Sequence, residues 1–439
     1  MQKSMDMHSK NEGHIVQKHR KNIQIGQRYW AQVGKRGMPA LGDARWTPDL
    51  ILSTWFMAET GRPPDNGMEY RIGASGGGFD VLEFKYLPDE QATNTVVDID
   101  LSIEFNRQVS GIKIEIPIPL YGGGMSYGSV CENVMLARAK SARKWGTFTS
   151  TGSGGFPESL IPFRDNIITQ VVAAMFGVRE QTIQYARIIE LQYAQGAKPG
   201  LGGHMRGDRV TPSVANLRES TPGISLLSPC TFQSVSSADD QRKQVDWIKT
   251  INPEALVSVK VAASSNIELV AVASFYAGTN IFHVDGSYGG TAGGQETAKK
   301  NIGMPIEFAV PKVHKVLVNE GIRDVITLIA SGGIRTAYDI AKAIALGADG
   351  CVVGTADLVA LGCTRCGNCD SERGCPYGLT TMDPLLSQLI DPDWGATRIS
   401  NYYQAIAYQL RDILRRLGLT SINQLRGRSD LLRYTGGGA

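Results

Sequence analysis

Eight short apolar runs, several of them rich in Val and Ile, recur from about residue 110 and alternate with helical stretches. Runs that stay apolar without alternating are typical of strands buried on both faces of a parallel sheet. The runs are Ile112–Leu120, Gly146–Thr151, Ile183–Leu191, Gly223–Ser228, Leu256–Ala262, Ile281–Asp285, Val325–Ala330 and Gly350–Val353. Helices are expected between them, for example at Asn133–Lys144, Ile267–Ala277, Ile306–Glu320 and Ala337–Leu346. Eight such units within roughly 250 residues predict an α/β fold, a (β/α)8 TIM barrel.

An open, doubly wound sheet is the competing layout, but no G-x-G-x-x-G follows an early strand. We expect three parts. Residues 1–90 form an irregular N-terminal extension with a helix near Pro48–Thr60, and residues 91–390 form the barrel. Residues 391–439 form a helical C-terminal tail, because Ile399–Leu417 has the apolar spacing of an amphipathic helix.

Composition excludes several classes of protein. The formal net charge of +3 on 439 residues is too small to indicate nucleic acid as a partner. The polar start, Met1 to Lys10, lacks the apolar segment of a signal peptide, and no stretch reaches transmembrane length. We therefore expect a cytoplasmic protein with no membrane partner.

Glycine or polar residues follow nearly every run, at the end of a barrel strand where active sites form. These segments are Gly122–Gly128, Gly152–Phe156, Gln195–Gly203, Lys260, Asp285–Gly294, Ser331–Arg335 and Gly354–Thr355. A purely structural barrel would not need so many of them at one rim, so the pattern predicts a ligand site there.

The last two loops predict a phosphate site, because exposed backbone N–H groups beside a helix N-terminus attract a dianion. Gly332, Gly333, Gly354 and Thr355 would supply these donors in SGGIR and VGT. FMN is the predicted ligand, and a sugar-phosphate substrate is the alternative.

Two lysines fit the same site. Lys198, in QGAKPG, could place its ammonium near the flavin N1 and C2 carbonyl and stabilise the reduced ring; the alternative is a surface lysine. Lys260 lies inside the apolar run LVSVKVAA and needs a charged partner, either a flavin or a carboxylate. An internal salt bridge would equally explain it.

Four cysteines lie close together as C-x2-C-x2-C-x5-C, at Cys363, Cys366, Cys369 and Cys375, with Pro376 following. This spacing is similar to iron–sulfur ligation of the ferredoxin type, with zinc as the alternative. The cysteines follow the phosphate loop almost directly, so a cluster there would lie close to the flavin. The other three cysteines, Cys131, Cys230 and Cys351, are expected to be small packed residues.

The chain resembles the flavin domain of the glutamate synthase family between about residues 115 and 390. The segments that carry the resemblance are GGMSYGS, TGSGG, QGAKPGLGGH, LRESTPGISLLSPC, VSVKV, VDGSYGGTAGG, ASGGIRTAYDIAKAIALGADGCVVGTA and CPYGLTTMDP. The resemblance implies FMN, an iron–sulfur cluster, and reduction of 2-iminoglutarate formed from 2-oxoglutarate and ammonia.

The resemblance also implies roles for single residues. Gln195 and Lys198 are expected at the flavin and the substrate as catalytic residues. Arg218 is expected to bind a carboxylate of 2-oxoglutarate, for which a guanidinium is well suited; the alternative is an arginine on a helix surface. His204 stands after GLGG, where the family often has Gln, and is assigned to the substrate site.

The loops and the resemblance together predict the flavin site. Its expected residues are Gly124, Met125, Ser126, Thr151, Gln195, Lys198, Lys260, Asp285, Gly286, Gly289, Gly290, Thr291, Ser331, Gly332, Gly333, Ile334, Gly354 and Thr355.

Three features depart from the family pattern. Phe156 replaces a frequent acid after TG-x-GG, and SPCTFQS replaces SPPPHHD, which could admit a different nitrogen donor. Four cysteines rather than three leave 3Fe–4S and 4Fe–4S clusters both open.

The start of the chain carries no nucleophilic cysteine, so we expect one subunit of a split enzyme. Its expected partners are a glutaminase-like subunit, further glutamate synthase-type subunits and an electron-donor protein. The leading interpretation is a multi-subunit glutamate synthase. The flavin subunit of N-methylglutamate synthase, which joins methylamine to glutamate, is the alternative. Two other classes are a 2-hydroxy acid oxidase, with His283 as its catalytic histidine, and a non-catalytic scaffold.

Overall fold

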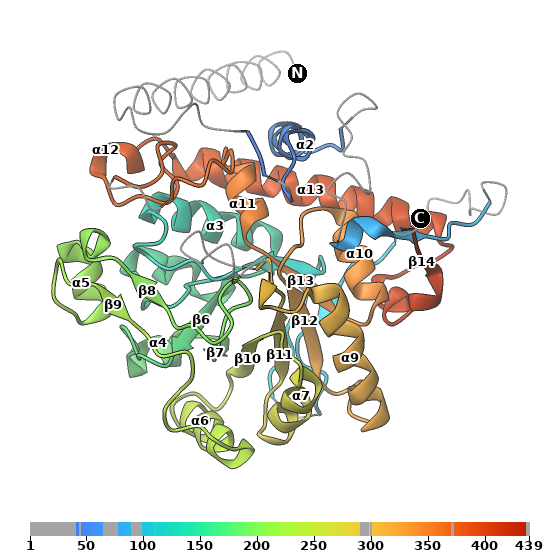
Figure 1. Cartoon of the computed structure of the whole chain (residues 1–439), viewed down its shortest axis with the longest axis horizontal. Helices are drawn as coiled ribbons and strands as arrows, with labels where there is room; N and C mark the ends of the chain where they lie inside the picture. Colours follow the sequence, from blue (N-terminus) through green and yellow to red (C-terminus); the bar gives the residue numbers. More distant parts are fainter. Residues whose placement is uncertain are drawn as a thin grey trace.

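The computed structural model describes residues 41–43, 45–64, 78–88, 99–109, 111–289, 298, 301–369 and 373–435. It confirms the predicted (β/α)8 barrel, with eight parallel strands in the order β4-β13-β12-β11-β10-β7-β6-β5. Figure 1 shows β10, β11, β12 and β13 side by side in this barrel. The barrel closes where β5 meets β4, because the Gly122 N–H donates to the Phe148 carbonyl at 2.9 Å and Gly124 bridges to Ser150. The strands are β4 (Leu120–Gly122), β5 (Thr149–Ser150), β6 (Ile167–Val172), β7 (Ile188–Gln192), β10 (Leu256–Ala262), β11 (Ile281–Asp285), β12 (Thr327–Ser331) and β13 (Gly350–Val353).

The assignment of the predicted run Gly223–Ser228 to the barrel is wrong. Its residues Leu226–Leu227 form β9, which pairs antiparallel with β8 (His204–Met205) in an excursion between β7 and β10. Leu227 is 70% exposed there, whereas all six residues of β6 are buried. The third barrel strand is therefore β6, a segment not predicted as a strand.

Three other predicted runs are much shorter as strands than expected. Of Gly146–Thr151, only Thr149–Ser150 forms a strand, β5. In Ile112–Leu120, Pro117 and Pro119 cannot donate to a ladder, so Glu115–Ile116 forms β3 and pairs with β2 (Ile103–Glu104) while β4 starts only at Leu120. The start of Ile183–Leu191 belongs to α4 (Glu180–Tyr185), and β7 begins at Ile188.

Helices surround the barrel, and the four predicted between strands are confirmed to within one or two residues (Figure 1). The helices that follow strands are α3 (Glu132–Trp145), α4 (Glu180–Tyr185), α5 (Pro212–Arg218), α6 (Ala238–Ile251), α7 (Ile267–Tyr276), α9 (Ile306–Asn319), α10 (Ala337–Ala345) and α11 (Thr355–Ala360). None of the helices in the described ranges is both long enough and apolar enough to cross a bilayer.

The chain segments before and after the barrel pack on it and meet each other. Helix α2 has the predicted bounds Pro48–Thr60, with Thr47 as its N-cap and Gly61 as its C-cap. Helix α13 (Pro392–Arg416) starts earlier than predicted because Asp391 caps it, and it packs against α2 and α3. β1 (Leu82–Phe84) pairs with β14 (Leu432–Tyr434). The short elements are α12 (Pro384–Ser387), η1 (Gly78–Val81), η3 (Glu158–Asn166), η4 (Gly207–Arg209), η5 (Ile422–Leu425) and η6 (Ser429–Leu431).

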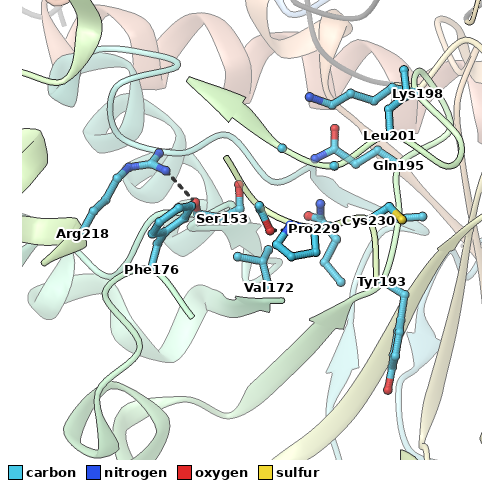
Figure 2. Close-up of a pocket in the computed structure, with 15 residues that line it drawn as sticks. Ser153, Val172, Phe176, Tyr193, Gln195, Lys198, Leu201, Arg218, Pro229 and Cys230 are labelled. Carbon is cyan, nitrogen blue, oxygen red and sulfur yellow. Dashed lines mark hydrogen bonds between the residues drawn. The ribbon is translucent and has the colours of Figure 1, made fainter. Parts of the chain in front are cut away.

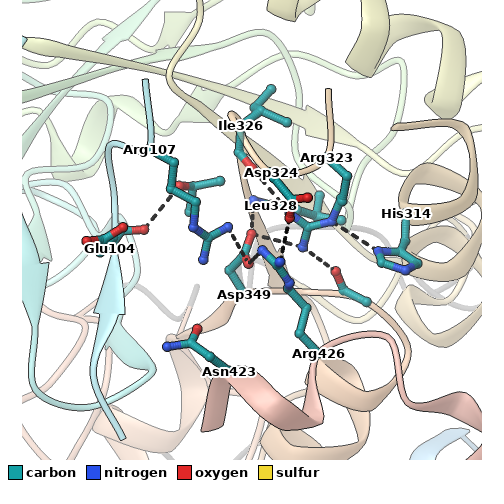
Figure 3. A network of polar contacts seen from close by, with 12 residues as sticks. Glu104, Arg107, His314, Arg323, Asp324, Ile326, Leu328, Asp349, Asn423 and Arg426 are labelled. Atoms are coloured by element: carbon teal, nitrogen blue, oxygen red, sulfur yellow. Dashed lines mark hydrogen bonds and ion pairs between the residues drawn. The ribbon is translucent and has the colours of Figure 1, made fainter. Parts of the chain in front are cut away.

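A buried ionic network ties the tail to the amino-terminal end of the barrel (Figure 3). The Asp349 carboxylate, just before β13, lies 2.6 Å from Arg107 and 3.0 Å from Arg323. Arg426, from the C-terminal tail, reaches the same carboxylate at 3.2 Å. Although burial alone would raise it, these guanidinium charges hold the pKa of Asp349 below its usual value.

Candidate functional site

A pocket lies at the carboxyl ends of β5, β6 and β7, against the excursion that carries β8 and β9 (Figure 2). It brings together Gln195, Lys198 and Arg218, three of the four residues that the sequence predicted at the substrate. The wall includes Val172 and Phe176. The pocket thus combines amide, cationic and apolar groups at the rim where barrel enzymes bind ligands.

Arg218 ends α5 and is only 4% exposed, which contradicts the alternative of a helix-surface arginine. Its guanidinium donates to the Ser153 and Tyr127 carbonyls at 3.1 Å and to Ser126 Oγ at 2.9 Å. Its Nε is buried without a hydrogen-bond partner among the described residues, none of which gives Arg218 an acidic partner. Burial lowers the pKa of Arg218 to about 10. Such a buried cation favours binding of an anion.

The loop after β7 holds Gln195 and Lys198 against the loop after β11. The Gly196 N–H donates to Asp285 Oδ2 at 2.9 Å, and a Cβ at Gly196 would lie 1.8 Å from the Gly286 carbonyl oxygen. Only glycine permits this approach. Lys198 is 7% exposed, so it is not a surface lysine.

Of the other predicted residues, some line the pocket and others lie away from it. His204 is exposed in β8, pairs with Leu227 and does not line the pocket. Cys230 is not a fully packed core residue: it is half-buried and lines the pocket beside Pro229. Ser126 and Thr151 are both buried. Gly290 and Thr291 lie outside the described residues.

Lys260, in β10, lies 3.4 Å from the carboxylate of Asp285 at the end of β11, and both residues are buried. Burial alone would raise the pKa of Asp285, but the charges of Lys260 and His283, with hydrogen bonds from Ser331 and Gly196, hold it below its usual value. The partner that a buried lysine requires is therefore a carboxylate of the barrel itself.

A chain of hydrogen bonds continues from Asp285 across the barrel interior. Asp285 Oδ1 accepts from Ser331 Oγ at 2.5 Å, and Ser331 Oγ lies 2.7 Å from His283 Nε2. His283 Nδ1 lies 2.8 Å from Glu190, which accepts from Gln170 at 2.7 Å. His283 is 1% exposed with both ring nitrogens engaged, so it does not offer the free imidazole expected of a 2-hydroxy acid oxidase.

Glu190 was not predicted from the sequence as a site residue. Burial alone would raise its pKa, but the charge and hydrogen bond of His283, with Lys260 and Gln170, bring it to about 2. A glutamate inside an apolar strand, like Lys260 in its own strand, is the signal that could have revealed it.

The loops after β12 and β13 have the geometry of a phosphate cradle. Gly332 and Gly333 both have positive φ, at 93° and 87°, and a Cβ at Gly332 would collide with Gly286 at 2.4 Å. A Cβ at Gly354 would make only an ordinary van der Waals contact, 3.7 Å from Met125 Cε. It caps α11, whose first backbone N–H groups have no partner within the helix. These residues fit the phosphate of a flavin mononucleotide.

The remaining predicted flavin residues lie on the same rim. Ile334 is buried in the SGGIR loop. A Cβ at Gly289 would lie 2.1 Å from Asp285 Oδ1, and one at Gly124 would lie 3.1 Å from Gln170.

The four clustered cysteines are all free thiols. Burial and the nearby Cys369 raise the pKa of the Cys375 thiol to about 12, and burial with Cys375 and Cys369 raises that of Cys363. The Arg365 backbone N–H donates to Cys363 Sγ at 3.4 Å. The donor chemistry suits an iron–sulfur cluster. In the part of the loop that is described, however, no three ligating side chains gather around one point.

Comparison with known proteins identifies relatives of the whole barrel. Residues 83–420 match the family described as "Conserved region in glutamate synthase". The archaeal-type glutamate synthase [NADPH] of Thermotoga maritima is 34% identical over 417 residues, covering 90% of this chain and 81% of that protein. The glutamate synthase [NADPH] large chain of Azospirillum brasilense is 34% identical over 326 residues, covering 72% of this chain but 21% of that one.

Among solved structures, an active mutant of (S)-mandelate dehydrogenase superposes with a TM-score of 0.53 at 15% identity. The match covers 88% of this chain and 99% of that one. At this identity the likeness supports the barrel fold alone.

Proposed function

The chain belongs to the glutamate synthase family of FMN-dependent oxidoreductases, and we propose that it reduces 2-iminoglutarate, formed from 2-oxoglutarate and ammonia, to L-glutamate. The observation that carries this proposal is Arg218, a buried guanidinium with no acidic partner among the described residues, in one pocket with Gln195 and Lys198. A dicarboxylate substrate would supply the missing anion.

The pocket residues have separate tasks in this proposal. Arg218 binds a substrate carboxylate, and its present hydrogen bonds to neutral oxygens keep the guanidinium in place. Lys198, buried in its loop, stabilises negative charge that develops during reduction. The Gln195 amide orients the imine, while Val172 and Phe176 exclude water from one wall.

FMN, when bound, supplies the two-electron chemistry that converts the imine to the amine. The loops carrying Gly332, Gly333, Gly354 and Thr355 would hold its phosphate. Lys260 and Asp285 form an ion pair beneath the rim, and because their opposite charges cancel, the pair presents no net charge there.

The four cysteines would hold an iron–sulfur cluster, and partner subunits would deliver ammonia and electrons. In support, the aligned region is a fifth of the Azospirillum brasilense large chain, so the barrel is one component of a larger enzyme in that relative. Metal analysis of the purified chain tests the cluster: iron supports it, and zinc at one per chain without iron contradicts it.

The flavin subunit of N-methylglutamate synthase is a second candidate, favoured by one observation. The loop SPCTFQS reaches the pocket through Pro229 and Cys230, and it carries Phe232 and Gln233 where the family pattern SPPPHHD has histidines. A loop without those histidines would admit a different nitrogen donor, such as methylamine. Exchange of the amine of glutamate for methylamine needs no net electron input.

Paired assays of the reconstituted complex separate the two candidates. One reaction contains 2-oxoglutarate, glutamine and a reductant; the other contains glutamate and methylamine. Glutamate formed only in the first supports the leading proposal, and N-methylglutamate formed in the second supports the alternative. Acid-released flavin that chromatographs as FAD rather than FMN would contradict both.

A further inference from the structure

The segment before α2 crosses the barrel rim beside the phosphate loop. The guanidinium carbon of Arg45 lies 4.0 Å from the ring centroid of Tyr288, in the loop after β11. A Cβ placed on Gly333 would lie 2.9 Å from a terminal nitrogen of the same guanidinium. The cation of Arg45 therefore lies directly against the backbone of the SGGIR loop.

The Arg45 guanidinium retains unused hydrogen-bonding capacity. Its Nε is buried and has no hydrogen-bond partner within the described ranges. No side-chain ion pair joins Arg45 to any acid described there; burial raises the pKa of Glu307, and the Arg45 charge only partly opposes this effect. A guanidinium that forms no ion pair with a described acid and lies beside a glycine loop favours binding of an anion there.

The arginine within SGGIR itself, Arg335, is not available to bind an anion at this loop. Arg335 is 1% exposed, and its guanidinium lies 2.7 Å from Asp80 and 3.0 Å from Asp339. These two carboxylates neutralise it away from the loop. A phosphate dianion on the SGGIR loop must therefore find its positive charge elsewhere.

Arg335 instead positions Arg45. Its guanidinium donates to the Arg45 carbonyl at 3.0 Å, while the Arg45 N–H donates to Asp43 at 2.9 Å. Asp43 also pairs with Arg365 of the cysteine loop at 2.7 Å. The backbone on both sides of Arg45 is thereby fixed, and its side chain is aimed across Tyr288.

We infer that Arg45 is the cation that binds the phosphate of FMN, closing the Gly332–Gly333 loop from the N-terminal side. The inference rests on the proposed function only in requiring that FMN binds at this loop. Stacking on Tyr288 holds the guanidinium beside the loop, where its N–H groups would donate to the phosphate oxygens.

The test compares FMN with riboflavin, which lacks the phosphate, binding to the deflavinated full chain by quenching of flavin fluorescence. Arg45→Met should weaken FMN binding about ten- to a hundredfold and leave riboflavin binding unchanged, as expected for one charged hydrogen-bonding contact. Arg45→Lys keeps the charge but loses the planar guanidinium, so its affinity for FMN should lie between those of wild type and Arg45→Met. Arg62→Met, an exposed arginine at the end of α2, is the matched control and should bind both ligands normally.

Each result of these binding measurements either supports or overturns the assignment of Arg45 to the FMN phosphate. Unchanged FMN affinity in Arg45→Met overturns the inference and leaves the proposed function standing. Equal losses of FMN and riboflavin reassign Arg45 to a structural role. If Arg45→Met does not fold, Arg45→Lys gives the same comparison. Wild-type protein that binds neither ligand overturns the proposed function and this inference together.

Discussion

Replacing Arg218 with methionine should weaken substrate binding with little cost to the stability of the fold. The pKa of Arg218 is about 10, against 12.5 for an unperturbed arginine. At 1.36 kcal/mol per unit of pKa, burial therefore disfavours the cation by about 3 kcal/mol. Hydrogen bonds to Ser153, Tyr127 and Ser126 offset this cost.

Methionine has a similar length and removes the burial cost and the hydrogen bonds together. We expect the free energy of unfolding without substrate to change by no more than about 2 kcal/mol, because the two effects oppose each other. The dissociation constant for 2-oxoglutarate should instead rise about ten- to a hundredfold, since the lost carboxylate contact contributes roughly 1.5–3 kcal/mol.

The assay is thermal unfolding of the flavin-loaded protein with increasing 2-oxoglutarate. Wild type should gain about 2.7 kcal/mol at a hundred times its dissociation constant, and Arg218→Met should gain only about 0.4–1.4 kcal/mol at the same concentration. Arg179→Met is the control, because Arg179 is exposed and pairs with Glu219, the neighbour of Arg218. Equal affinity in Arg218→Met and wild type, or a much larger loss of stability without substrate, would refute the reasoning.

Three further predictions concern other parts of the barrel. The folded-state pKa of Glu190 is about 2, below the ordinary 4.5, so its stabilisation of about 3 kcal/mol is present above pH 4.5 and is lost as the pH falls towards 2. The free energy of unfolding of Glu190→Gln, measured in urea, should therefore fall less steeply at acid pH than that of wild type. An equally steep fall in both proteins would exclude this role for Glu190. Asp349→Asn should lower the free energy of unfolding by about 3–5 kcal/mol, because it strips a buried arginine cluster of its anion, whereas Asn at the exposed Asp324 should cost at most about 1 kcal/mol. Lys198→Met should slow turnover far more than it weakens FMN binding, measured by rapid reduction and by flavin titration; a loss confined to FMN affinity would make Lys198 a structural contact.

The sequence predicted the barrel but misplaced its third strand, for a physical reason. Rules for parallel strands look for continuous apolar runs, yet alternate residues of a barrel strand face the interior. Here that interior carries polar groups: Gln170 from β6 joins Glu190 and His283. Thr169 and Gln170 interrupt the apolar run of β6, so a strand that supplies the polar network is the one least visible in the sequence.

Loops were easier to find than single contacts, because their glycines are dictated by local geometry. Gly196 and Gly332 stand where any side chain would strike the Gly286 backbone, and that requirement is visible as a motif. The position of His204 depends instead on the pairing of β8 with β9, and the run that contains β9 had been predicted as a barrel strand.

Charge compensation between distant segments marks the limit of prediction from sequence. Arg335 belongs to a phosphate-loop motif, but Asp80 neutralises it from a position 255 residues earlier in the chain. Arg45 reaches the same loop from 290 residues away in sequence, and only the packing of the N-terminal segment on the rim aims it there. Local pattern thus identifies where an anion binds, because backbone N–H groups are local, while the cation that completes the site is chosen by tertiary contacts. The identity of that cation must therefore be sought in the ion pairs of neighbouring arginines, by asking which guanidinium the fold leaves without a carboxylate.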